Sequence, residues 1–299
     1  MLQQVVKTYF PSEEIVAAYA YGSKVFPQYK SKPGKQTDLI FVVEDLEDFH
    51  KANKAKNAHH YSCVERCLNQ AKVINGVGAR VYYHQNIHIQ GNVYKYGVVS
   101  RRHFEDAMSN CSNMFICGRF HKPTLQVFSN NNNNYERLIK LNQRNAFALV
   151  ALKSKANVSK ETFYTDIINV SYTGDIRNCV RLEPNDKSKK ILKGAFKLFD
   201  QMYSQYALSS SRTKLKLNQD LHSYYKQLPP FIQRKLPVNV ANYPLEKRKE
   251  CVERLCKIEN AKVSALAALS GMYSSFNIGY VANKYMKRFE ERVNTCYKV

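Results

Sequence analysis

The chain has 299 residues, 44% of them hydrophobic, which is enough to bury a core and to form about two domains. This composition argues against disorder throughout the chain. Lysine and arginine outnumber aspartate and glutamate by 46 to 24, and the formal net charge of +22 favours polyanionic partners such as nucleotides, nucleic acid or acidic phospholipids. No run of about 18 uncharged apolar residues occurs, so we expect any membrane contact to be peripheral.

The cysteines and histidines indicate neither a disulfide framework nor a zinc site. The eight cysteines include no C-x-x-C pair, which favours a reduced compartment. The histidines lack the closely spaced ligand pairs that are typical of structural zinc. The N-terminus shows neither an apolar signal core nor an Arg/Ser-rich transit stretch, so it predicts no destination.

The first half of the chain alternates short apolar segments with helical ones. Segments rich in Val, Ile, Phe and Tyr predict strands at residues 15–21, 39–43, 78–83 and 94–100. The second of these is apolar throughout, as in a sheet covered by other elements. We therefore expect an antiparallel or mixed sheet with helices on one side.

A tract of asparagines at residues 130–134 cannot bury apolar surface and predicts a loop with a domain boundary near it. Beyond this tract the pattern is mainly helical. The clearest helix has apolar residues at helical spacing: Leu192, Phe196, Phe199, Met202 and Tyr206. Another side of the same helix carries a row of lysines, which we interpret as solvated: Lys190, Lys193 and Lys197.

A Gly-Ser turn followed by an acidic strand start is the first candidate for chemistry. Tyr21, Gly22 and Ser23 end the first predicted strand, and Asp38 directly precedes the second. A glycine lets backbone N–H groups approach a phosphate, and a carboxylate on the next strand can hold Mg²⁺ against a triphosphate. The pattern fits attack by one phosphate on the α-phosphorus of a nucleotide. Alone, it also fits an ordinary turn with a capping aspartate.

Further short motifs lie around and beyond this turn. In chain order they are Val25-Phe26-Pro27-Gln28, Asp38-Leu39-Ile40-Phe41, Phe49-His50, His60-Tyr61-Ser62, Gly78-Ala79-Arg80-Val81-Tyr82-Tyr83, Lys95-Tyr96-Gly97-Val98-Val99-Ser100, Gly118-Arg119-Phe120-His121-Lys122-Pro123 and Ser171-Tyr172-Thr173-Gly174-Asp175-Ile176-Arg177. Together with the turn, these motifs closely resemble the mitochondrial phosphatidate cytidylyltransferase family, also called the mitochondrial translocator assembly and maintenance family. The similarity runs from about residue 19 to residue 177 and is only loose beyond it.

This resemblance implies an α+β fold in three parts. A nucleotidyltransferase domain of the polymerase-β type, with a mixed sheet and helices, would span residues 1–129. A mainly helical, winged-helix-like domain that completes the nucleotide pocket would span residues 135–220, and a C-terminal helical, membrane-associated region residues 221–299. The implied reaction converts CTP and phosphatidate to CDP-diacylglycerol and pyrophosphate, with Mg²⁺ as cofactor, and feeds cardiolipin synthesis.

The resemblance also suggests roles for single residues. Asp38 would hold Mg²⁺, and Lys95 would neutralise charge on the leaving pyrophosphate. The nucleotide would be bound by Tyr21, Gly22, Ser23, Tyr172, Gly174, Asp175 and Arg177. The phosphate of phosphatidate would be bound by Arg119 and Lys122, because arginine grips a phosphate at two points and lysine acts as a point charge. The alternative for these cations is an ordinary solvated surface position.

Two positions depart from the expected patterns. Lys24 stands where the family usually has the second glycine of Gly-Ser-Gly, which narrows the backbone freedom of the turn. Ile40 stands where the wider polymerase-β superfamily has a second carboxylate, on the same strand face as Asp38. The candidates for a further metal ligand are Asp45, His60 and Asp175. A buried histidine of the core is the alternative for His60.

The end of the chain predicts a membrane contact. Val281, Tyr285, Phe289 and Val293 recur every four residues, beside a row formed by Lys284, Arg288 and Arg292. We expect an amphipathic helix on an anionic membrane surface, or else a helix packed against the core. By resemblance, the membrane is the mitochondrial inner membrane on its matrix side, and no nucleic-acid partner is expected.

Two other functions fit the sequence. One is a nucleotidyltransferase acting on RNA ends, which the charge and the 21 tyrosines favour and the missing second carboxylate opposes. The other is a non-enzymatic basic binding protein on the same fold, for which Lys24 is the main support.

Overall fold

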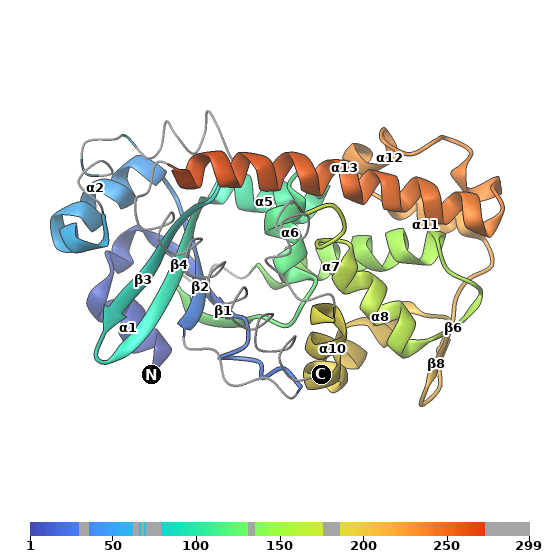
Figure 1. Cartoon of the computed structure of the whole chain (residues 1–299), viewed down its shortest axis with the longest axis horizontal. Coiled ribbons are helices and arrows are strands. Elements are labelled where there is room, and N and C mark those ends of the chain that lie inside the picture. The colour runs from blue at the N-terminus through green and yellow to red at the C-terminus, as the bar shows by residue number, and fades with distance from the viewer. Residues whose placement is uncertain are drawn as a thin grey trace, which may run out of the picture.

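The computed structural model describes residues 1–29, 36–61, 66, 69, 79–130, 135–175 and 186–272. Its helices and strands are shown in Figure 1 and follow the order α1 (Leu2–Tyr9), β1 (Ile15–Tyr21), β2 (Gln36–Val43), α2 (Leu46–Lys56), β3 (Tyr82–Ile89), β4 (Asn92–Ser100), α5 (Arg101–Asn110), α6 (Met114–Phe120), β5 (Leu125–Ser129), α7 (Glu136–Leu152), β6 (Asn157–Ser159), α8 (Lys160–Asn169), α10 (Lys187–Tyr203), β7 (Ser209–Ser210), β8 (Lys214–Lys216), α11 (Leu221–Gln227), α12 (Pro230–Gln233) and α13 (Leu245–Met272).

The first half of the chain forms a five-stranded sheet with the strand order β3-β4-β2-β1-β5. β2 and β4 run parallel and the other neighbouring strands run antiparallel, so the sheet is mixed, as the resemblance implies. The predicted strands at residues 15–21, 39–43 and 94–100 are confirmed. The bounds predicted for β3 are wrong, because Arg80 has φ +53°, a left-handed conformation that interrupts an extended strand.

Helices cover both faces of this sheet, so the expectation of helices on one side is wrong. Leu39 and Phe41 of β2 belong to a buried cluster that includes residues of α1 and α2. Ile40 and Val42 belong to a second cluster, with residues of α5 and α6. Because successive side chains of a strand point to opposite faces, β2 is buried on both, and this explains its continuous apolar run.

The second half of the chain is mainly helical, with a small antiparallel sheet in the order β6-β8-β7. α10 confirms the helix predicted around Leu192 and buries Leu192, Phe199 and Tyr203. One hydrophobic cluster extends from Val16 on β1 to Cys256 on α13, so the core is continuous across the boundary predicted near residue 130. The three domain limits stay a prediction.

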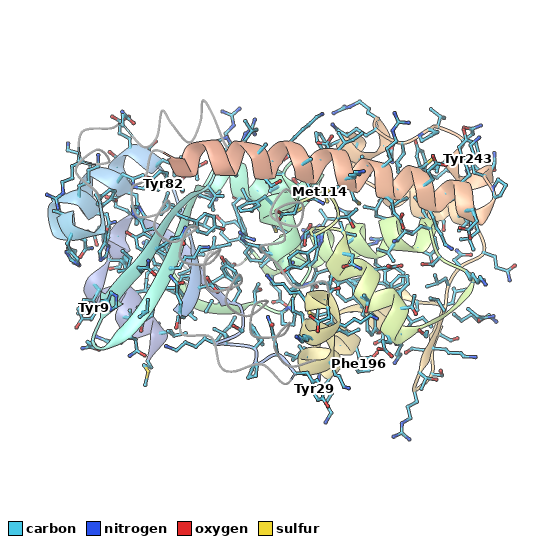
Figure 2. The ribbon with its side chains drawn as sticks, viewed as in Figure 1. Tyr9, Tyr29, Tyr82, Met114, Phe196 and Tyr243 are labelled. Carbon is cyan, nitrogen blue, oxygen red and sulfur yellow. The ribbon has the colours of Figure 1, made fainter. Side chains whose placement is uncertain are left out.

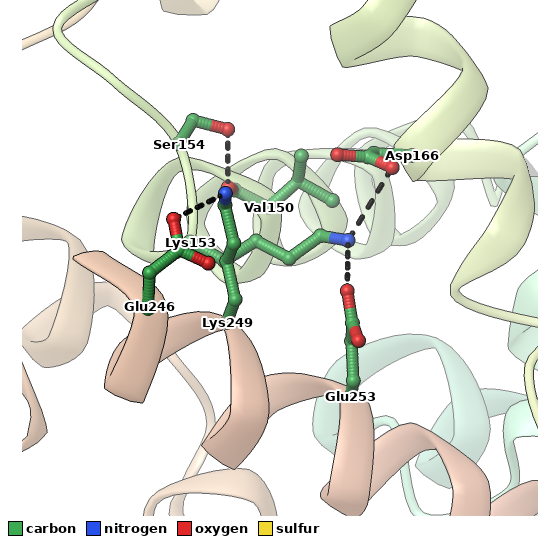
Figure 3. Close-up of polar contacts among 7 residues, drawn as sticks. All are labelled: Val150, Lys153, Ser154, Asp166, Glu246, Lys249 and Glu253. Atoms are coloured by element: carbon green, nitrogen blue, oxygen red, sulfur yellow. Dashed lines mark hydrogen bonds and ion pairs between the residues drawn. The ribbon is translucent and has the colours of Figure 1, made fainter.

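α13 runs along the length of the molecule, from α11 and α12 at one end past α6 to the side of the large sheet (Figure 1). Lys153 forms ion pairs with both α8 and α13. Its Nζ lies 3.3 Å from Oδ1 of Asp166 on α8 and 3.4 Å from Oε1 of Glu253 on α13 (Figure 3). The lysine side chain is only 10% exposed, so water screens these ion pairs less than surface pairs. Within the described residues, no helix combines the length and apolarity needed to cross a membrane.

Candidate active site

The register of the sheet places three of the predicted site residues in one row. Tyr21 of β1 lies opposite Asp38 of β2, and Asp38 lies beside Lys95 of β4. Ile40, two residues after Asp38 on the same face, belongs to the buried cluster under α5 and α6. The row therefore lies on this face of the sheet, where the Gly-Ser turn leaves β1.

The turn and the carboxylate are in direct contact. Gly22 has φ +84°, and a Cβ added to it would lie only 2.5 Å from Oδ2 of Asp38. The carbonyl of Gly22 accepts the N–H groups of Val25 (3.2 Å) and Phe26 (2.9 Å), which closes the turn. A glycine is required here for its conformation and for the space that the Asp38 carboxylate occupies.

Lys24 does not disturb this turn. The positive φ belongs to Gly22, and Lys24 is not among the described residues with positive φ. Its side chain is exposed and Nζ donates to Oδ1 of Asn92, at the start of β4, at 3.1 Å. The backbone of the turn therefore needs no second glycine at position 24.

Tyr83 of β3 joins the members of the row. It lies opposite Gly97 of β4, where a Cβ would come within 2.6 Å of its ring. Nζ of Lys95 lies 4.8 Å from the centre of the Tyr83 ring, within range of a cation–π contact. Burial raises the pKa of Tyr21 well above its usual value, and the neighbouring Tyr83 adds to this shift, so Tyr21 stays a neutral phenol.

Arg119 of α6 enters the same group. Its Nε donates to Oη of Tyr83 at 2.7 Å. The guanidinium lies 4.1 Å from the ring centre of Phe115 and 5.5 Å from that of Tyr21. A side chain held between rings has fewer conformations to lose when it binds an anion. The predicted role of Arg119 is thus compatible with its position beside the Asp38 row.

A second group of cations surrounds Tyr172. Nζ of Lys122 lies 4.9 Å from the Tyr172 ring centre and donates to Oγ of Ser171 at 2.9 Å. Nζ of Lys187, at the start of α10, lies 5.1 Å from the same ring. Nζ of Lys122 also donates to the carbonyl of Gly118, the residue before Arg119, which brings this group next to the first. The gathered cations suit an anionic substrate.

The turn that carries Tyr172 is fixed by α13. Gly174 has φ +83°, and a Cβ there would meet the Lys257 carbonyl oxygen at 2.3 Å. Nδ2 of Asn260 donates to the carbonyls of Val170 (2.7 Å) and Thr173 (2.8 Å). Asp175 follows, buried, and its N–H donates to the Tyr172 carbonyl at 3.2 Å. Arg177 lies outside the described residues.

Two of the three candidates for a further metal ligand lie away from Asp38. Asp45 caps the N-terminus of α2, at the other end of β2, where Oδ1 accepts the N–H of Glu47 at 2.6 Å. His60 is buried on the opposite face of the sheet, with Nδ1 3.0 Å from Oη of Tyr96. Burial, then His84 and His59, lowers the pKa of His60 to about 3, so it is a neutral core histidine.

The carboxylate of Asp38 alone still fits a magnesium site. Among the described residues there is no group of three His, Cys, Asp or Glu side chains that could hold a metal ion. Mg²⁺ in phosphate-transfer sites is commonly held by one or two carboxylates, with water and substrate phosphates as the other ligands. Asp38 next to the Gly22 turn is compatible with that arrangement, which needs no all-protein cage.

Three residues of this site were not assigned roles from the sequence. The pairing of β3 with β4 places Tyr83 opposite Gly97 in the site. α10 places Lys187 beside Tyr172, and α13 places Asn260 against the turn that carries Tyr172. Only Tyr83 lies in one of the motifs, so the motifs could have indicated it. The other two depend on contacts between distant segments and have no local signal.

Comparisons with known proteins identify the family of this chain. The family model described as "Phosphatidate cytidylyltransferase, mitochondrial" matches residues 2–287. Proteins of that name are similar to this chain: one from Caenorhabditis briggsae, 32% identical over 64% of this chain and 60% of its own length, one from Mus musculus, 29% identical over 72% and 64%, and one from Homo sapiens, 27% identical over 85% and 58%. The chain thus spans about three fifths of the length of these relatives. Since the family model covers nearly the whole sequence, the chain belongs to the mitochondrial phosphatidate cytidylyltransferase family.

Proposed function

We propose that this protein transfers the cytidylyl group of CTP to phosphatidate, producing CDP-diacylglycerol and pyrophosphate. The single observation that carries the proposal is the contact between Asp38 and Gly22, beside Lys95. It joins a carboxylate, a phosphate-binding turn and a cation, which are the parts that nucleotidyl transfer needs. The names of the relatives identify the substrates.

In this proposal a phosphate oxygen of phosphatidate attacks the α-phosphorus of CTP and the bond to the β-phosphate oxygen breaks. Asp38 would hold Mg²⁺, which would neutralise the triphosphate and the leaving pyrophosphate. Gly22 and Ser23 would bind the β- and γ-phosphates, and Lys95 would stabilise the pyrophosphate as its charge grows. Because the attacking phosphate is already anionic at neutral pH, the reaction requires positioning and charge neutralisation more than a general base.

The remaining groups would bind the other parts of the substrates. Arg119 and Lys122 would bind the phosphate of phosphatidate, with Arg119 already fixed by Tyr83. Tyr172 and its turn would contact the nucleoside, and Tyr21 would line the same space. Arg177 belongs to this proposal by resemblance only.

The finer structural assignments belong to the same proposal. The mixed sheet with Asp38 supports a polymerase-β type of nucleotidyltransferase domain, and the three-stranded sheet beside α8 supports a winged-helix-like second domain. Peripheral attachment to the matrix side of the mitochondrial inner membrane, and supply of cardiolipin synthesis, follow from the family. The amphipathic helix predicted at residues 281–293 lies outside the described residues.

The alternatives are less well supported. Ile40 is 1% exposed, packed in the core under α5 and α6, so the second carboxylate of template-dependent polymerases has no place on this strand. The non-enzymatic alternative depended on Lys24, and the turn keeps its geometry with Lys24 directed to Asn92.

The test is transfer of label from α-³²P-CTP into chloroform-soluble lipid, with phosphatidate and Mg²⁺ present. We expect labelled CDP-diacylglycerol from the wild type, a yield lower by about 10²-fold or more with Asp38→Asn, and normal product with Asp45→Asn, which removes a carboxylate far from the site. Labelled RNA ends with no labelled lipid would refute the proposal, and so would equal transfer by Asp38→Asn.

A further inference from the structure

One side of α10 carries a stripe of exposed lysines. Lys189, Lys193 and Lys197 recur every four residues, and all three are exposed. Lys189 and Lys193 lie above one another on the helix, and Lys197 follows one turn later, beyond the kink in α10 at Ala195, so all three lie along its exposed side. The opposite side of the helix is buried in the core.

The acidic residues that flank the stripe are paired with other lysines. Asp186 lies 2.8 Å from Nζ of Lys190, and Asp200 lies 2.6 Å from Nζ of the buried Lys160. No acidic residue occurs in the sequence between them. The stripe therefore keeps its positive charge.

The hairpin that follows α10 extends this positive surface. Arg212, Lys214 and Lys216 lie in and next to β8 and are exposed, while Leu215 between the lysines is buried. The sequence has no acidic residue from position 201 to position 219. In Figure 1 α10 and the β8 hairpin lie along the same lower side of the molecule.

Exposed apolar side chains occur on the elements that carry these cations and next to them. Leu198 of α10 is 37% exposed, Tyr29 is 40% exposed and Leu208, just before β7, is 63% exposed. Figure 2 shows Tyr29 beside α10 near Phe196, and Nζ of Lys193 lies 4.0 Å from the Tyr29 ring centre. Cations around exposed leucine and tyrosine are typical of proteins that bind a membrane surface peripherally.

This surface adjoins the candidate active site. The N–H of Tyr29 donates to the carbonyl of Lys190 at 3.2 Å, and a Cβ on Gly194 would lie 2.2 Å from the carbonyl oxygen of Pro27. The segment that follows the Gly-Ser turn thus packs directly on α10. At the N-terminus of the same helix, Lys187 faces Tyr172 in the site. α10 therefore connects the site with the lysine stripe.

We propose that this surface, formed by the lysine stripe of α10, the β7–β8 hairpin, Tyr29, Leu198 and Leu208, docks the protein on an anionic phospholipid membrane. The inference rests on the proposed function, because the acyl chains of phosphatidate keep that substrate in a bilayer. Docking through a surface next to the site brings the headgroup to the reacting atoms. Each lysine near an anionic surface contributes to binding, and the contribution falls as salt rises.

A membrane fits this surface better than a nucleic acid does. Single strands bind basic grooves in which several aromatic side chains stack with successive bases. Here the protruding side chains are two leucines and one tyrosine. Leucine enters the headgroup boundary readily but gives a base little to stack on.

The experiment measures cosedimentation of the full chain with vesicles of phosphatidylcholine and phosphatidylglycerol, an anionic lipid that is not the proposed substrate. The variant combines Lys189→Gln, Lys193→Gln and Lys197→Gln. The control combines Lys7→Gln, Lys51→Gln and Lys226→Gln, exposed positions on α1, α2 and α11 with the same loss of charge. At low salt we expect the variant to bind about 100-fold more weakly and the control to change little.

A second assay separates this proposal from the proposed function. With a short-chain phosphatidate that is soluble as monomers, the stripe variant should transfer the cytidylyl group at the wild-type rate, whereas with phosphatidate in vesicles it should be slow. Equal vesicle binding by variant and control would overturn the docking surface and leave the function intact. Loss of affinity for a single-stranded RNA oligonucleotide, with vesicle binding unchanged, would assign the surface to nucleic acid. Failure of the wild-type protein on the soluble substrate would count against the proposed function alone.

Discussion

Oδ2 of Asp38 occupies the space that a side chain on Gly22 would need, since a Cβ there would lie 2.5 Å away. We predict that Gly22→Ala displaces the carboxylate and lowers transfer by about 10²-fold or more, as expected when an electrostatic contact to the transition state is lost. Alanine is also strained at φ +84°, so a control is needed. Gly91→Ala has that strain at φ +72° with no atom within 4 Å of the new Cβ, and its activity should be normal.

Asp38→Asn tests the charge of the same residue without changing its shape. The amide keeps the volume of the carboxylate, so the protein should fold and melt as the wild type does. Transfer should fall by about 10²-fold or more, because a neutral amide is a poor ligand for Mg²⁺. Steady-state rates over a range of Mg²⁺ concentrations measure this. Near-normal turnover by a stable variant would show that Asp38 is not a ligand of the metal.

Tyr83 should act as a positioning residue for two different cations. Tyr83→Phe keeps the ring under Lys95 but removes the acceptor of the Arg119 hydrogen bond. We predict a KM for phosphatidate raised about tenfold, the cost of one hydrogen bond to a charged group, with the KM for CTP unchanged. Tyr83→Leu should impair the use of both substrates, and Lys95→Ala should reproduce only the CTP defect.

A different result would change the interpretation of Tyr83. Equal rises in both KM values for Tyr83→Phe would mean that the hydroxyl supports the sheet as a whole and not Arg119. Unchanged kinetics in Lys95→Ala across a CTP titration would make Lys95 an ordinary surface lysine.

The strands that carry the site could be predicted from local sequence, but which strands pair with one another could not. β1 and residues 39–43 of β2 are continuous apolar runs. Gly22 follows the first run and Asp38 precedes the second. That Asp38 lies beside Lys95 depends on a parallel pairing of β2 with β4, which the spacing of residues does not reveal. The apolar run at residues 39–43 predicts a strand in a covered sheet, and helices do cover both faces, although the sequence pattern led to an expectation of helices on one side only.

The residues that hold the site together come from far along the chain. Asn260 bonds to carbonyls 90 and 87 residues earlier, and nothing in the local pattern of α13 marks it. For His60 the sequence allowed both a metal ligand and a core histidine. The choice depends on which face of the sheet the segment after α2 covers, and that is decided by packing.

Asn260 should be required for the position of the Tyr172 turn. Asn260→Leu keeps a similar volume but leaves the Val170 and Thr173 carbonyls without their donor, which should cost about 2 kcal/mol or more of unfolding free energy. We also predict a higher KM for CTP. Cys256→Ala, one turn earlier on α13, removes buried packing but no hydrogen bond to the turn, and should lower stability with the KM for CTP unchanged. Equal kinetics in the two variants would contradict a specific role of Asn260.

Buried histidines should make the fold sensitive to acid. His60 and His84 each have a pKa lowered by burial to about 3, and burial lowers the pKa of His50 well below its usual value. In the unfolded chain their pKa values return to about 6.5, so below that pH the unfolded state binds more protons than the folded state. The contribution of these neutral histidines to the free energy of unfolding is therefore fully present above about pH 6.5 and declines as the pH falls toward 3.

At pH 5.5 each of these histidines should lower the free energy of unfolding by about 1.4 kcal/mol relative to pH 7.5. Urea unfolding at the two pH values measures the difference. His60→Asn can keep a hydrogen bond to Tyr96, and it should reduce the loss between the two pH values by about 1.4 kcal/mol, because asparagine does not titrate. The control is His88→Asn, at an exposed position of β3, which should leave the loss as in the wild type. If His60→Asn loses as much stability as the wild type between pH 7.5 and 5.5, then His60 can already be protonated in the folded protein. In that case its burial and its hydrogen bond to Tyr96 do not keep it neutral.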